Sequence, residues 1–109
     1  MAYNQGLADD LRARLEGRPG LSEREMFGGI GFMINGNMAV GVSGDNLMVR
    51  VGKEAHDEAL SQPGVRDFDM SGRPMRGWIL VSPEGIPTEQ DLGRWVDQGV
   101  AHAESLPPK

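Results

Sequence analysis

The chain has 109 residues, no cysteine and a formal net charge of −5 at pH 7. This length is typical of one domain, expected here over residues 1–109, which can bury a core without disulfides or metals. The lack of cysteine excludes disulfides, thiolate catalysis and cysteine zinc sites, and the negative charge argues against broad binding to phosphate backbones.

The N-terminal residues show no targeting pattern. They have no basic start followed by an apolar run, which a signal peptide would have. No segment approaches the roughly 20 apolar residues that a membrane helix needs. Together with the cysteine usage, these features predict a cytoplasmic protein without a membrane partner.

The first predicted element is an amphipathic helix over residues 3–16. Leu7, Leu11 and Leu15 recur every four residues and therefore share one face of that helix. Gly17 follows the last turn, at the position where helices commonly end.

Residues 23–51 predict consecutive strands joined by tight turns. The expected strands are residues 23–26, 30–34, 38–42 and 46–51. Asn35 and Gly36 lie between two apolar segments, a pair that is typical of a two-residue hairpin turn. Short strands in this succession indicate an antiparallel meander.

The second half of the chain predicts a helix, two strands and a final helix. The expected segments are a helix over 53–61, strands over 65–70 and 78–81 with a turn at 71–74, and a helix over 88–106. Thr88 can cap the final helix, and Gly99 within it permits close packing against a neighbour.

The element order is therefore α-β4-α-β2-α, which indicates an α+β fold. We expect a two-layer α/β sandwich with an antiparallel sheet of about five to six strands and with the helices on one face. The methionines gather in the strand segments: Met26, Met33, Met38, Met48, Met70 and Met75. Most of them are expected in the core, and the others on an uncovered sheet face that would favour a homodimer.

A glycine-rich segment, residues 26–33, predicts a bend. Phe27, Gly28 and Gly29 are its candidate binding residues, since a phosphate-binding loop would use glycines in this way. A dinucleotide fingerprint would need a further glycine where Ile34 stands, and a helix after it. A strand is expected there instead, so the bend is interpreted mainly as a structural irregularity.

A second group of candidate binding residues combines arginines with an indole, and we call it the arginine–tryptophan patch. Its members are Arg50, Lys53, Arg73, Met75, Arg76 and Trp78. Arginine pairs with phosphate and tryptophan stacks on bases, so the patch could contact an anion or a nucleic acid. The alternative is a buried Trp78 beside arginines that are solvated or paired with acids.

The sequence offers no group of residues that indicates catalysis. His56 and His102 are far apart and are both expected at the surface, and no further ligands for a metal can be identified. No nucleophile motif and no pair of acids arranged for acid/base work is recognisable. A protein without catalytic residues, metal or cofactor is therefore expected.

Four segments, taken together, resemble the N-terminal domain of the TfoX/Sxy family. They are residues 26–29 (MFGG), 35–38 (NGNM), 47–52 (LMVRVG) and 72–78 (GRPMRGW). The resemblance implies a two-layer sandwich similar to secretion-chaperone-like domains. The family is named for bacterial regulators of natural competence, which act with other transcription factors and carry a second, C-terminal domain. The resemblance over nearly the whole chain implies a stand-alone, single-domain member.

We therefore expect a regulatory, protein-binding module that acts on the transcription machinery through a partner protein. One alternative is direct nucleic-acid binding through the arginine–tryptophan patch. Another is a small-molecule or enzymatic role at the glycine-rich bend.

Overall fold

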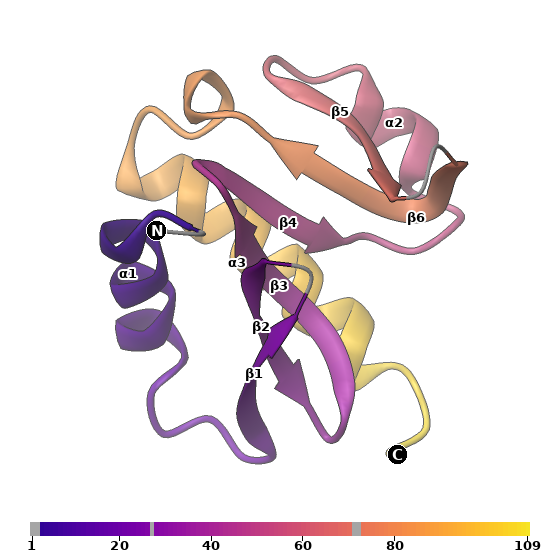
Figure 1. Ribbon diagram of the computed structural model, residues 1–109. Coiled ribbons are helices and arrows are strands. Elements are labelled where there is room, and N and C mark those ends of the chain that lie inside the picture. Colours follow the sequence, from indigo (N-terminus) through magenta and orange to yellow (C-terminus); the bar gives the residue numbers. More distant parts are fainter. Residues whose placement is uncertain (1–2, 27, 71–72) are drawn as a thin grey trace.

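The computed structural model describes residues 3–26, 28–70 and 73–109, which form three α helices and a six-stranded antiparallel sheet (Figure 1). In chain order the elements are α1 (Gln5–Leu15), β1 (Leu21–Met26), β2 (Gly29–Ile34), β3 (Asn37–Ser43), β4 (Asn46–Arg50), α2 (His56–Leu60), β5 (Val65–Met70), β6 (Arg73–Val81), the short 3-10 turn η1 (Pro83–Gly85) and α3 (Glu89–Glu104). The predicted α+β fold and the predicted element order are confirmed.

The sheet has the strand order β1-β2-β3-β4-β6-β5. The first four strands form the predicted meander, and Asn35 and Gly36 turn the β2–β3 hairpin with φ angles of 53° and 84°. Two positive φ angles in succession are the geometry for which an Asn-Gly pair is selected. β6 then inserts between β4 and β5, with Arg50 opposite Trp78.

Two boundaries differ from the prediction. β6 begins at Arg73 rather than at residue 78, because its first residues pair with β5 although Pro74 and Gly77 are typical of a turn. α2 spans only His56–Leu60, since residues 53–55 form a turn that leads into it. Among the described helices, none has the length and apolar character needed to cross a bilayer.

The main core lies between one face of the sheet and the helices. α1 contributes its predicted leucine face, α2 contributes Ala59, and α3 contributes the largest buried side chain, Trp95. Facing them are fully buried strand residues such as Phe32 and Val49. In Figure 1, α3 runs behind the central strands, which agrees with its contacts to β2, β3 and β4.

α3 approaches β3 closely at Gly99. The β2–β3 register shifts between Phe32 and Met33, so that Ala39 has no partner on β2. A Cβ atom at Gly99 would lie 2.5 Å from the carbonyl oxygen of Ala39. The helix can therefore pack on this bulge only because position 99 has no side chain.

Replacing Gly99 with alanine is expected to destabilise the protein by about 2 kcal/mol, since the overlap with backbone outweighs the roughly 1 kcal/mol gained in helix propensity. Gly93→Ala in the same helix is the matched control. Its Cβ would meet only the flexible end of Arg14, so it should be neutral or slightly stabilising. Urea unfolding of both variants measures the difference, and equal effects would contradict this explanation.

The other face of the sheet carries a second, smaller cluster made only of strand residues, which we call the methionine face. Its buried members are Met38, Met48, Phe68 and Leu80, and its partly exposed members are Met33, Met75 and Trp78. Every helix residue of the described core belongs to the other cluster. The helices therefore cover one face, as predicted, while the methionine face packs on itself and remains partly exposed at its rim.

The last residues lie against the β2–β3 turn. Asn37 is buried, and its amide Nδ2 donates to the carbonyl oxygen of Pro107 at 2.9 Å. The amide of Lys109 donates to the carbonyl oxygen of Asn35 at 2.8 Å. These bonds hold the residues that follow α3 beside the sheet.

Candidate functional site

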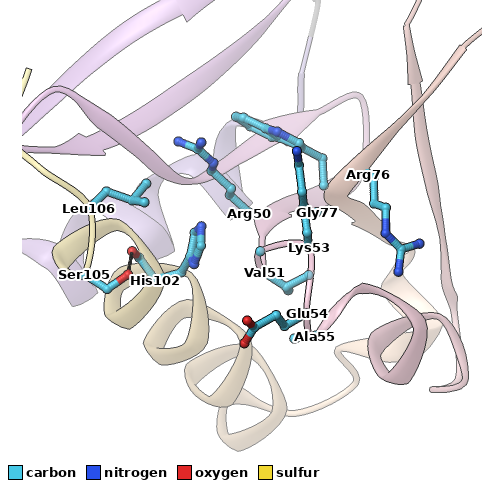
Figure 2. Close-up of a pocket in the computed structure, with 12 residues that line it drawn as sticks. Arg50, Val51, Lys53, Glu54, Ala55, Arg76, Gly77, His102, Ser105 and Leu106 are labelled. Atoms are coloured by element: carbon cyan, nitrogen blue, oxygen red, sulfur yellow. Dashed lines mark hydrogen bonds between the residues drawn. The ribbon is translucent and has the colours of Figure 1, made fainter.

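The most developed pocket lies where β4, the following loop, β6 and the C-terminal end of α3 meet (Figure 2). Its volume is about 590 Å³. The walls are Arg50, loop residues 51–55, residues 76–78 of β6, and His102 with the two residues that follow α3. Three of the lining side chains are cationic and one, Glu54, is acidic.

Gly77 shapes this pocket by bending β6. Its φ angle is +94°, which a residue with a side chain rarely adopts. Its carbonyl oxygen accepts from the amides of Val51 and Gly52 at 2.8 and 3.1 Å. On the other side of the strand, the β5–β6 register shifts between Asp67 and Asp69. The bend therefore ties β6 to the loop that forms the pocket wall.

His56 fixes the bend from behind. Its Nδ1 accepts the amide hydrogen of Gly77 at 2.9 Å, so Nε2 carries the ring proton and donates to Asp67 Oδ1 at 2.8 Å. The residue is only 3% exposed. The expectation that His56 lies at the surface is therefore wrong, because a backbone amide and a carboxylate satisfy both ring nitrogens in the interior.

Arg50 and Trp78 form a stacked pair at the pocket rim. The guanidinium carbon lies 5.2 Å from the centre of the indole, a distance at which a cation is attracted to the ring. The indole also packs near Phe68, with ring centres 6.3 Å apart. Trp78 thus contacts the pocket through Arg50 and the methionine face through Phe68.

Arg76 is turned away from the pocket interior, toward α2 (Figure 2). Its two terminal nitrogens lie 3.2 Å from the carboxylate oxygens of Asp57. This hydrogen bonding lowers the pKa of Asp57 and raises that of Arg76. Both side chains are exposed, so the pair contributes little to stability, but it occupies the guanidinium.

His102 forms the opposite wall, with its ring directed toward Arg50 in Figure 2. Burial lowers its pKa, and the nearby positive charge of Arg50 lowers it further. The ring packs on Gly52, where a Cβ atom would lie 2.7 Å from Cε1 of the imidazole. His102 is partly buried rather than a freely exposed surface residue, and at neutral pH burial and Arg50 favour its neutral form.

The structure brings part of the arginine–tryptophan patch together. Arg50, Lys53, Arg76 and Trp78 all line the pocket. Met75 belongs to the rim of the methionine face. Arg73 begins β6, and its side chain lies outside the described part of the structure.

The glycine-rich bend is a separate region. Phe27 lies outside the described residues, and Gly28 is exposed with a φ angle of +75°. Gly29 is buried against the carbonyl group of Val42, near the start of β4, whereas Arg50 ends that strand. The bend and the pocket therefore lie at opposite ends of β4, and Gly29 has a structural reason to be glycine.

Sequence reasoning missed the contribution of His56, Gly77 and His102 to the site. Gly77 had a signal, since a glycine within a strand segment indicates a bend or a close backbone approach. The histidines had none, because their partners come from β5, β6 and β4, which are distant in the chain. Within the described residues, no group of three or more metal-ligating side chains comes together.

Comparison with protein families gives one match. The family model described as the TfoX N-terminal domain matches residues 13–103, a range that includes all four segments of the resemblance and most of the pocket. No curated protein and no solved structure matched the chain.

Proposed function

Because the chain belongs to the TfoX N-terminal domain family, we propose that it is a regulatory module without catalytic activity, related in role to the regulators of competence. In this proposal it works in the cytoplasm as a homodimer and acts on the transcription machinery by binding a protein partner. The family assignment supports a regulatory role, and the methionine face supports protein binding.

The observation that carries the proposal is the rim of the methionine face. Met33, Met75 and Trp78 are partly exposed there, around a centre that is already buried. Methionine adapts its shape to different partners, and aromatic residues are enriched at protein interfaces. A sheet face without helices can also pair with the same face of a second copy around a two-fold axis.

The solution mass tests self-association. Light scattering is expected to give twice the 11.8 kDa of one chain. The double variant Met33→Lys/Met75→Lys should give the mass of one chain, because charges at the rim cannot be buried without a partner charge. Ala101→Lys, on the exposed side of α3, is the matched control and should remain dimeric. A single-chain mass for the unmodified protein would rule out the homodimer.

The regulatory role needs its own readout. Producing the protein in a bacterial host should change the levels of a defined set of transcripts, and the Met33→Lys/Met75→Lys variant at equal abundance should not. The Ala101→Lys control should reproduce the effect of the unmodified protein. Unchanged transcripts in all three strains would reject the regulatory proposal.

Direct nucleic-acid binding draws less support from the geometry. Arg76 is engaged with Asp57, and Arg50 lies over one face of the Trp78 indole on which a base would stack. The net charge of −5 opposes approach to phosphate backbones. Light scattering with a short DNA duplex at low salt provides the test, and a complex that dissociates as salt rises would favour this alternative.

A further inference from the structure

The pocket carries more positive charge than its own acids can balance. Among the described residues, neither Arg50 nor Lys53 has a carboxylate within ion-pair distance, although acids outnumber basic residues 16 to 11 in the chain. Glu54 is the one acid in the lining, and Arg76 already has Asp57. The interior of the pocket therefore presents two cations against one carboxylate.

Arg50 is held in place before any ligand arrives. Its guanidinium lies over the Trp78 indole at 5.2 Å, and the residue ends β4 in register with Trp78. No hydrogen-bond acceptor for it occurs among the described residues, so its planar set of N–H donors remains available. A guanidinium fixed in this way loses little freedom when it binds two oxygens of an anion.

His102 responds to the same uncompensated charge. Burial lowers its pKa, and Arg50 contributes in the same direction because no bound anion offsets the arginine. The ring is held against Gly52, which leaves no room for a side chain between them. An anion beside Arg50 would reverse the second contribution and provide an acceptor for the imidazole.

The dimensions indicate an organic anion rather than a bare ion. A volume of about 590 Å³ is within the range of small-molecule sites. Val51, Ala55 and Leu106 give the lining an apolar part beside the cations. A ligand that fills the pocket therefore needs an anionic group and an apolar body.

We propose that this pocket binds a small organic phosphate, with the phosphate group between Arg50 and Lys53 and the apolar part against Leu106. A phosphate matches the excess of two cations better than a carboxylate does, since it carries close to two negative charges at neutral pH. Because Arg50 stacks on Trp78, and Trp78 packs near Phe68, the bound ligand also changes the environment of the methionine-face rim.

Phenyl phosphate is a suitable probe, and NMR with the full chain at constant ionic strength is a suitable measurement. Saturable shifts are expected for the His102 ring and the Trp78 indole, while the indole of Trp95, fully buried in the main core, should not move. The pKa of His102 should rise when the probe is bound. Absence of saturable shifts at millimolar phenyl phosphate would overturn the proposal.

Variants separate the site from general charge effects. Arg50→Gln is expected to weaken binding at least about tenfold, since it removes a charge-assisted contact. Arg50→Lys keeps the charge and should still weaken binding several-fold, because it loses the fork of donors. Arg66→Gln, an exposed arginine on β5, is the matched control and should bind like the unmodified chain. Equal weakening by Arg66→Gln would reduce the effect to net charge and reject the site.

Two further probes define the ligand class. Inorganic sulfate should bind more weakly than phenyl phosphate, since it lacks the apolar part, and benzoate should bind more weakly, since it has one charge. Benzoate binding as tight as that of phenyl phosphate would reject the assignment to phosphate. These measurements do not depend on dimerisation or transcription, so the ligand site and the proposed function can fail separately.

Discussion

Replacing Gly29 with alanine is expected to cost about 3 kcal/mol of folding free energy or more, while the same change at Gly28 should cost about 1 kcal/mol. At Gly29 a Cβ atom would overlap the carbonyl oxygen of Val42, which belongs to the backbone of the neighbouring strand and cannot move without opening the sheet. At Gly28 the space around a Cβ atom is open, and only the φ angle of +75° opposes a side chain.

Urea unfolding followed by circular dichroism measures both variants. Gly28→Asn provides a second control, because asparagine tolerates a positive φ angle better than alanine and should recover part of the loss. If Gly29→Ala proved as mild as Gly28→Ala, the close approach of β3 would not be the reason for glycine at this position, and a ligand-binding role of the bend would regain weight.

Replacing His56 with leucine is expected to cost about 3 kcal/mol, although leucine fills a similar volume. The buried amide of Gly77 would lose its acceptor, and the carboxylate of Asp67 would lose a donor. The same substitution at His102 is the matched control and should cost less than about 1 kcal/mol, since no described hydrogen bond depends on that ring.

Thermal or urea unfolding of the two leucine variants distinguishes the roles of the histidines. Asp67→Asn adds a further comparison: it keeps an oxygen that can accept from Nε2, so its effect should be smaller than that of His56→Leu. If both histidine variants were equally stable, His56 would not hold the β6 bend, and the expectation of two surface histidines would be restored.

The sheet and its order could be predicted because each element has a local pattern. The leucines of α1 repeat at helical spacing, Asn35 and Gly36 specify a hairpin, and Thr88 caps α3 as expected, accepting from the amide of Asp91 at 3.1 Å. The start of β6 was missed, since Pro74 and Gly77 have turn propensity and only pairing with β5 makes the segment a strand. Local propensity is outweighed there by long-range hydrogen bonds.

The candidate site was predicted in part for a similar reason. Arg50, Lys53, Arg76 and Trp78 were singled out because their chemistry suits anions, and the β4–β6 pairing places them together. Their roles diverge once neighbours are known: Arg76 is paired with Asp57, while Arg50 is stacked on Trp78 and has no described acid partner. The pairing of each charge depends on residues that are distant in the chain.

The sequence by itself determined the α+β class, the order of elements and the resemblance to the TfoX family, because helical and strand periodicities and turn pairs act over a few residues. Only the tertiary structure decided that His56 is buried, that Gly29 and Gly99 are sites of close backbone approach, and that Arg50 and His102 face one pocket. These properties arise from contacts between residues far apart in the chain, which no local pattern specifies.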